Sequence, residues 1–456
     1  MLEELSQAAS QFEFTPEPKA TGRIHRVVGL TIEAIGLRAA VGSRCLIEHP
    51  EHRPVEAEVV GFEDDRSFLV ALAGQNQLFP GSRVRPLDSS GLIGVGDALL
   101  GRVINALEEP LDDHGEIKCQ QSVRFTGPRI NPMQRQPINT PLDVGVRSIN
   151  SLLTLGRGQR IGLFAGSGVG KSTLLGMITR YTAADVVVVG LVGERGREVR
   201  EFIDHNMNET TRRKAIVVAS PADETPLMRI RAANTATRIA EHFRDSGKHV
   251  LLLMDSLSRY AQAHREVALA AGEPPATRGY PASVFAKLPT LVERAGNGEH
   301  GNGSLTAIYT VLTDGDELQD PVADAARAIL DGHIVLSRDL ADAGHFPAID
   351  VGASVSRVMP NICGAGQLQQ AMQFKQWNAA FNDVRDLISI GAYQQGANSL
   401  ADAAVAKWPF MQAFLQQAVE AGVDMQRATQ DLGQLVNTPI NQTLPETSQS
   451  TELEAT

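Results

Sequence analysis

The stretch AGSGVGKS, residues 165–172, constrains the fold of this chain more than any other part of the sequence. An apolar run, RIGLFA, leads into it and a helical pattern, STLLGMITRY, follows it. Glycines let the backbone wrap closely around an anion, and the first turn of the helix directs its N–H groups inward. The usual pattern opens with Gly where this chain has Ala165, but the flanking strand and helix are the confirming context. The stretch therefore predicts a nucleotide-phosphate loop rather than a plain glycine-rich turn.

Strand-like apolar runs alternate with helical stretches from about residue 96 to residue 362. The longest runs are apolar at every position, as expected of strands buried on both faces of a parallel sheet. The alternation predicts an α/β core with right-handed crossovers and helices on both faces. The predicted strands are RIGLFA, DVVVVGLVG, KAIVVAS, HVLLLMD, SLTAIYTVL and HIVLS, and the helices between them include KSTLLGMITRYT and MRIRAANTATRIAEHFRDSG.

The regions on either side of this core have different patterns. Residues 21–95 contain short extended runs separated by Gly and Pro turns, which predicts a small β-barrel. Residues 363–437 have helical patterns in QLQQAMQFKQWNAAFNDVRDL and KWPFMQAFLQQAVEAG. Residues 1–20 are either a frayed terminus or a short helix that docks on a partner, on another subunit or on a membrane surface. The polar stretch 438–456 is expected to be disordered.

Composition favours a cytoplasmic protein. The net charge of −11 argues against a generally basic nucleic-acid binder, although it leaves room for a local basic patch. Cys45, Cys119 and Cys363 stand far apart, without the spacing of zinc ligands, and we expect them to be packing thiols in a reducing compartment. The N-terminal MLEELSQAASQFEF lacks the apolar core of a signal peptide, and runs such as VVVVGLVG are too short to span a bilayer.

Four side chains near predicted strand ends are candidates for nucleotide chemistry. Lys171 would reach the β and γ phosphates, and the hydroxyl of Ser172 would bind Mg²⁺. Asp255 ends HVLLLMD, at the sheet edge where open α/β sheets bind ligands, and would complete the magnesium shell; alternatively it caps the next helix. Glu194 follows DVVVVGLVG and could orient the attacking water; alternatively it forms a surface ion pair in the charged run ERGREVREF.

Longer motifs make a family resemblance specific. GERGREV, MDSLSRYA, EPPATRGYPASVFAKLPTLVERAGNG and PAIDVGASVSRVM occur in this order. Together they resemble the ATPase of the flagellar and type III protein-export apparatus, a family similar to the catalytic subunit of rotary F-type ATP synthases. The resemblance covers about residues 20–430. It implies a P-loop, RecA-like parallel-sheet ATPase core with an N-terminal β-barrel and a C-terminal helical domain. The sequence around the phosphate loop and PPATRGYP resembles the flagellar branch more than the virulence branch.

The resemblance also implies roles for individual residues. Glu194 matches the glutamate that polarises the attacking water, and Arg195 follows it as in the family. Arg259 matches an arginine that faces the γ-phosphate region. Arg357 matches the arginine finger that a neighbouring subunit inserts, and Phe346 occupies the place of an aromatic residue, often Tyr, that packs on adenine. The implied ligands are ATP and Mg²⁺, with Mg²⁺ at Ser172 and Asp255 and the nucleotide on Gly166, Ser167, Gly168, Val169, Gly170, Lys171, Ser172 and Thr173.

The same resemblance implies ATP hydrolysis that energises protein export, including chaperone release and delivery of cargo to a membrane export gate. The implied partners are further copies of the chain in a hexameric ring, a dimeric regulator subunit, a central stalk-like protein, export chaperone–cargo complexes and the export gate. The implied location is the cytoplasm, at the inner face of the cell membrane. The acidic loop 313–324 is either a stalk contact or a solvated loop.

Three alternatives have recognisable sequence requirements. A virulence-type (injectisome) secretion ATPase would share the same motifs. A non-catalytic subunit of a rotary ATPase would carry Gln where this chain has Glu194. A ring-shaped RNA translocase would need stacking aromatics in a basic groove of the barrel, whereas residues 21–95 offer only Phe62, Phe68 and Phe79 among many acids. We therefore expect no specific nucleic-acid partner.

Overall fold

The computed structural model describes residues 20–49, 53–74, 78–87, 91–128, 130–299, 303–313 and 320–439. Two compact units divide the chain: residues 1–91 with Leu269–Glu273, and the remainder. The predicted terminal segments 1–20 and 438–456 lie almost wholly outside the described residues, as does the centre of the acidic loop 313–324. The finer division of the chain at residues 95, 362 and 437 stays a prediction.

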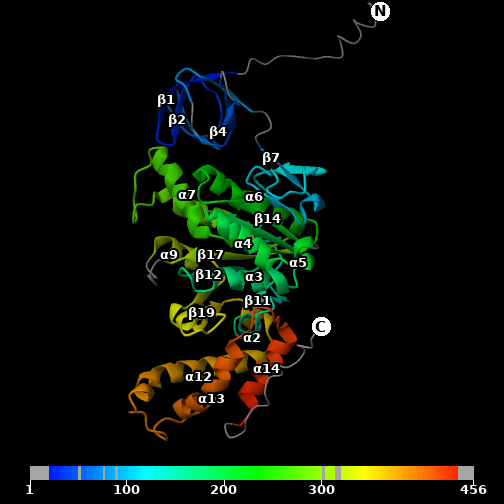
Figure 1. Cartoon of the computed structure of the whole chain (residues 1–456), viewed down its shortest axis with the longest axis vertical. Coiled ribbons are helices and arrows are strands. Elements are labelled where there is room, and N and C mark those ends of the chain that lie inside the picture. Colours follow the sequence, from blue (N-terminus) through cyan, green and yellow to red (C-terminus); the bar gives the residue numbers. More distant parts are fainter. Residues whose placement is uncertain are drawn as a thin grey trace, which may run out of the picture. The chain divides into compact units, whose positions relative to one another are not determined.

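The first unit is a closed six-stranded barrel, as the sequence predicts (Figure 1). The strands follow one another around the barrel in the order β1-β2-β5-β4-β3-β6. Inward-facing apolar side chains such as Ile32, Ile47 and Leu69 are fully buried and form its core. The strands are β1 (Gly22–Val28), β2 (Thr31–Ile35), β3 (Arg44–Ile47), β4 (Val55–Glu63), β5 (Arg66–Ala71) and β6 (Arg83–Pro86).

The second unit contains a nine-stranded sheet with the order β19-β18-β12-β17-β15-β13-β14-β8, and β16 pairs with β17. Neighbours from β18 to β8 along this order are parallel, whereas β19 runs antiparallel to β18. The sheet strands are β8 (Val103–Ile104), β12 (Arg160–Ala165), β13 (Val186–Val192), β14 (Ala215–Ser220), β15 (His249–Asp255), β16 (Gly296–Asn297), β17 (Ser304–Leu312), β18 (Gly332–Leu336) and β19 (Ile349–Ser356). Two small sheets pair β7 (Leu92–Val95) with β9 (Gln121–Arg124) and β10 (Pro141–Leu142) with β11 (Leu155–Gly156).

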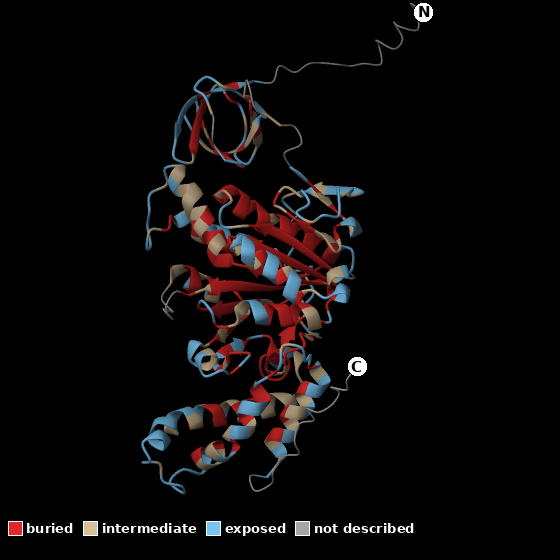
Figure 2. Cartoon of the chain, viewed as in Figure 1, coloured by how far each residue is buried: buried red, intermediate tan, exposed pale blue. Residues whose placement is uncertain are grey.

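Both faces of the central strands are buried, which explains their unbroken apolar sequences (Figure 2). On one face, Val189 and Leu253 share a core with Leu174 of α3 (Lys171–Tyr181). On the other face, Gly190 lets α6 (Pro226–Asp245) approach closely, because a Cβ there would lie 3.2 Å from the Cβ of Ala236. The other helices of this part are α2 (Arg147–Leu152), α4 (Gly196–Asn206), α5 (Glu209–Arg213), α7 (Leu257–Ala270), α8 (Ala282–Val292), α9 (Pro321–Ile329), α10 (Arg338–Asp342) and α11 (Met359–Ile362), with a short 3₁₀ turn at Asp97–Leu99.

The C-terminal helices are α12 (Ala365–Ser389), α13 (Ser399–Leu415) and α14 (Met425–Asn437). Phe381 of α12 stacks on Trp408 of α13 with the ring centroids 3.8 Å apart. The pattern KWPFMQAFLQQAVEAG predicts a helix over 407–422, and this range is wrong at both ends. Asn398 accepts from the N–H groups of Leu400 and Ala401 and starts the helix earlier, and the helix ends at Leu415.

The structure confirms the predicted fold class, a parallel-sheet α/β core with a barrel before it and helices after it. Among the described residues, no helix combines the length and the apolar character that crossing a membrane requires.

Candidate active site

The phosphate loop joins the end of β12 to the start of α3. Gly168 and Gly170 have φ angles of +79° and +86°, in the left-handed region that glycine adopts without strain. Val169 is buried and anchors the loop, whereas Ser172 and Thr173 are exposed in the first turn of α3. The glycines therefore permit a tight turn that leaves the end of the helix open to a ligand.

The backbone donors of this loop lack partners within the protein. Among the described residues, no acceptor takes a hydrogen bond from the N–H groups of residues 166–170. Most backbone donors in folded proteins are paired, so a run of unpaired donors is unusual. The run stands at the N-terminus of the eleven-residue helix α3, whose own first N–H groups have no partners inside the helix. Such a loop fits a phosphate chain.

Lys171, Asp255 and Glu194 meet at the mouth of the loop. The Nζ atom of Lys171 lies 2.6 Å from Oδ1 of Asp255 and 3.3 Å from Oε1 of Glu194. The three side chains are between 5% and 13% exposed. Strands β12, β13 and β15 are parallel members of one sheet, so the residues that follow them gather at one edge. The sequence expectation that these residues meet at one edge agrees with this geometry.

The electrostatics of the cluster keep the lysine charged and give one carboxyl group a pKa close to neutral pH. Burial disfavours the charge on Lys171, but the carboxylates of Asp255 and Glu194 outweigh burial and raise its pKa. Burial, assisted by the charge of Asp255, raises the pKa of Glu194 to about 7. The hydroxyl of Thr310 on β17 donates to Oδ1 of Asp255 at 2.6 Å and fixes that carboxylate. A carboxylate with such a pKa can accept a proton from water at neutral pH.

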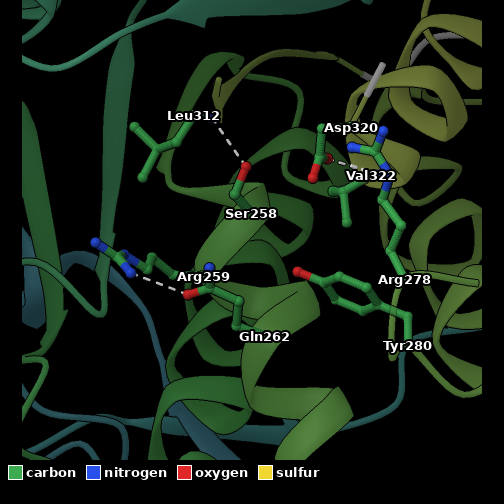
Figure 3. Close-up of a pocket in the computed structure, with 8 residues that line it drawn as sticks. All are labelled: Ser258, Arg259, Gln262, Arg278, Tyr280, Leu312, Asp320 and Val322. Atoms are coloured by element: carbon green, nitrogen blue, oxygen red, sulfur yellow. Dashed lines mark hydrogen bonds between the residues drawn. The ribbon is translucent and has the colours of Figure 1, made fainter. Parts of the chain in front are cut away.

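The two other predicted arginines near this edge have different surroundings. A Cβ on Gly193 would lie 2.9 Å from the Cβ of Arg259, so glycine lets α7 pack against the end of β13. Nη1 of Arg259 donates to Oε1 of Gln262 at 2.9 Å, at the border of a pocket of about 220 Å³ (Figure 3). Arg195 is 77% exposed and pairs with Glu198 on α4. Among the described residues, Arg195 forms no hydrogen bond or ion pair with the lysine cluster, so this geometry gives no support to its predicted catalytic role.

Phe346 lies against the phosphate loop. A Cβ on Gly170 would come within 3.4 Å of two atoms of the Phe346 ring, so the ring covers the last glycine of the loop. The side chain is 43% exposed, and the backbone carbonyl of Phe346 accepts from the N–H of Gln417. An exposed aromatic face beside the loop is suited to stacking on a base. The alternative of a core aromatic does not fit this exposure.

Arg357 stands at the opposite edge of the sheet. It follows β19, which runs antiparallel to β18, and its N–H donates to the carbonyl of Asp331 just before β18. The phosphate loop follows the other end of β12, about 16 Å away along a six-residue strand. Within the described part of the chain, the guanidinium donates only to main-chain carbonyls, those of Leu330 and Arg327. The exposed Arg357 and Lys171 of the same chain therefore do not share a site.

Sequence reasoning missed two residues of this region. Thr310 is fully buried on β17, and its hydrogen bond to Asp255 has no signature in the sequence. Arg338 follows β18, a parallel neighbour of β12, and its Nη2 donates to the carbonyl of Ser167 at 3.0 Å. The rule that placed Glu194 and Asp255, a polar residue at or just beyond the end of a parallel strand, could have identified Arg338 as well.

Comparison with known proteins identifies the family. The nucleotide-binding domain model of the ATP synthase alpha/beta family matches residues 145–356, and the C-terminal domain model of the T3SS EscN ATPase matches residues 363–434. A flagellum-specific ATP synthase of Pseudomonas aeruginosa is 56% identical over 423 residues, which are 92% of this chain and 94% of the relative.

Solved structures agree with this result. The assembled ATPase EscN from the type III secretion system of enteropathogenic E. coli has a TM-score of 0.86 and 43% identity, over 91% of this chain and all of that chain. The same ATPase in complex with its central stalk EscO has a TM-score of 0.83 and 42% identity, over the same shares of the two chains. The chain therefore belongs to the family of flagellum-specific and type III secretion ATPases, and it is an export ATPase of the ATP synthase alpha/beta group.

Proposed function

We propose that this chain hydrolyses Mg²⁺-bound ATP to energise the export of flagellar proteins, in a ring whose active sites lie between subunits. The division of the site between two edges of the sheet carries this proposal. Lys171, Glu194 and Asp255 stand at one edge, whereas Arg357 stands at the other. One chain has every part of the site, but its own arginine cannot reach its own lysine.

Each side chain at the loop has a role in phosphoryl transfer, which depends mainly on positioning and charge neutralisation. Lys171 binds the β and γ phosphates after exchanging its two carboxylate partners for them. An Oε atom of Glu194 orients the attacking water and accepts its proton, as a pKa of about 7 allows. Arg259 stands next to the end of β13 and neutralises charge in the γ-phosphate region. Phe346 stacks on adenine, where the absence of a tyrosine hydroxyl leaves the ring face unchanged.

The residues present fit a magnesium ion. Mg²⁺ prefers oxygen ligands, usually a few from the protein with the remainder from phosphates and water. Ser172 offers an exposed hydroxyl in the first turn of α3, and Asp255 offers a carboxylate held in place by Thr310. These two side chains would hold the ion, which would neutralise charge on the phosphates.

A finger supplied in trans requires a neighbouring subunit, and in a closed ring every interface supplies Arg357 to the next site. A hexamer is the ring size that we infer from the family. The assembled EscN structure, at 43% identity, supports assembly as the working form. Its complex with the stalk EscO supports a stalk-like protein as a partner of this chain. The acidic loop 313–324 is one candidate stalk contact, and residues 314–319 of it lie outside the described part of the chain.

The flagellar branch is favoured over the injectisome branch, because the flagellum-specific relative is 56% identical and EscN is 43% identical. The relatives also favour an export ATPase over an RNA translocase or a non-catalytic rotary subunit. Release of cargo from chaperones, delivery to a membrane export gate, a dimeric regulator subunit and a cytoplasmic position at the inner face of the membrane complete the proposal. We infer these points from the family resemblance.

The test is ATP turnover per subunit across a protein dilution series, with the oligomeric state measured in parallel. We expect turnover per subunit to rise steeply with concentration, in step with ring formation, because Arg357 of a second chain completes each site. Constant turnover down to a demonstrated monomer would contradict the proposal that two subunits share each site. No turnover at any concentration, with Mg²⁺ present, would contradict the catalytic roles that we assign.

A further inference from the structure

Arg338 is a cation at the phosphate loop to which neither the sequence motifs nor the family models assign a role. It begins α10, one residue beyond β18, and the intervening Ser337 caps this helix by accepting from the N–H of Leu340. The exposed side chain extends from there to the neighbouring strand's loop. Its Nη2 atom donates to the carbonyl oxygen of Ser167 at 3.0 Å, and a Cβ on Gly166 would lie 3.3 Å from the same nitrogen. Gly166 therefore leaves room for the guanidinium.

The carbonyl of Ser167 and the N–H of Gly168 belong to one peptide unit. In a planar trans peptide these two groups point in opposite directions. Because Arg338 donates to this carbonyl, the Gly168 N–H points away from Arg338. That N–H is one of the loop donors without an acceptor among the described residues.

This peptide unit needs a fixed orientation because glycine does not supply one. Gly168 has φ of +79°, and a Cβ built on it would meet no atom within 4 Å, so neither sterics nor packing holds the unit. Val169, by contrast, is buried and fixed by its side chain. A loop donor that is free to turn away loses part of its contribution to phosphate binding, since oriented donors act without reorganisation.

We propose that Arg338 is a positioning residue that holds the Ser167–Gly168 peptide with its N–H directed at the bound phosphates. The proposal rests on the proposed nucleotide site, whose phosphate loop it completes from outside. A hydrogen bond to a charged group typically contributes roughly 10-fold to 100-fold to an affinity. Loss of the oriented N–H should thus weaken ATP and ADP together, because both place phosphates in this loop.

The experiment compares Arg338→Met, which keeps the apolar stem but removes the donors, with Arg338→Lys, which keeps one charged donor. The control variant is Arg197→Met, which changes an exposed arginine on α4. We measure KM and kcat for ATP and the Kd of ADP by titration calorimetry. For Arg338→Met we expect KM and the ADP Kd to rise about 10-fold with kcat changed less than about 3-fold, and Arg338→Lys to restore most of the affinity.

A merely structural role would reduce the active fraction, and so kcat, while leaving KM and the ADP Kd unchanged; that result overturns the proposal. Equal values for wild type and Arg338→Met overturn it too. Affinity that Arg338→Lys fails to restore at all also counts against a hydrogen-bond role. If the wild-type chain binds ADP but turns over no ATP, the proposed function fails, and the ADP arm still tests Arg338 alone.

Discussion

The two edges of the central sheet differ in how many of the proposed catalytic side chains a single chain brings together there. At the edge of the phosphate loop, Lys171 contacts Asp255 and Glu194 directly, and the three side chains are nearly buried. At the other edge, Arg357 is exposed and donates to the main-chain carbonyls of Leu330 and Arg327. At the first edge, the cation has its carboxylate partners within the chain. At the second, the cation has no carboxylate partner among the described residues. This contrast is the basis of our proposal that each active site is completed by a second subunit.

The largest expected effect comes from the exposed edge. Arg357→Ala should lower ATP turnover by about 1,000-fold or more, the usual contribution of an arginine finger. Mixing this variant with Lys171→Ala subunits should restore part of the activity, because some interfaces then combine an intact loop with an intact finger. Steady-state turnover across mixing ratios measures this.

The control for the exposed edge is Arg385→Ala, which removes an exposed arginine on α12 and should keep wild-type turnover. If activity stays absent at every mixing ratio, Arg357 and Lys171 must act within the same chain. That result would contradict the proposed difference between the two edges.

The next effect concerns the buried edge. Glu194→Gln should keep ATP binding but reduce kcat by about 100-fold to 10,000-fold, because an amide cannot accept a proton from water. Equilibrium binding of ATP and single-turnover rates separate the two steps. Glu201→Gln, on an exposed position of α4, is the matched control. Undiminished turnover in Glu194→Gln would remove the catalytic role of this side chain.

A smaller effect is expected beside the loop at Phe346. Phe346→Ala should raise the KM for ATP about 10-fold with little change in kcat, because base–aromatic stacking contributes about 1–3 kcal/mol. Phe346→Tyr should leave KM unchanged, since it keeps the ring that covers Gly170. A raised KM in the tyrosine variant, or an unchanged KM in the alanine variant, would place adenine elsewhere.

The smallest effect is the pH dependence of the buried edge. In the proposed mechanism Glu194 acts in its deprotonated form, and its pKa of about 7 lies above the usual value. Activity should therefore fall with acidification, with kcat/KM dropping about threefold from pH 7.5 to pH 6.5. Initial rates at low ATP concentration measure this limb, and the residual activity of Glu194→Gln should lack it. A rise in kcat/KM over the same range would assign the proton step to another group.

The parallel sheet and most of the cluster at the phosphate loop can be predicted from the amino-acid sequence. Unbroken apolar runs such as HVLLLMD identify strands buried on both faces, and here the prediction matches β15 residue for residue. Parallel strands end at one edge, so Lys171, Glu194 and Asp255 could be grouped from their positions alone. The ends of helices were harder to predict from the sequence. The start of α13, for example, depends on the cap at Asn398 rather than on periodicity.

Only the tertiary structure decided the rest. Strand β19 runs antiparallel to β18, which places Arg357 away from the phosphate loop of the same chain. No local sequence pattern encodes strand direction. The contact of Arg338 with Ser167 joins residues 171 positions apart, and that of Thr310 with Asp255 joins residues 55 apart. Local sequence sets burial and periodicity, whereas these contacts depend on which strands become neighbours in the folded sheet. The sheet order β18-β12-β17-β15 therefore decided which side chains reach the phosphate site.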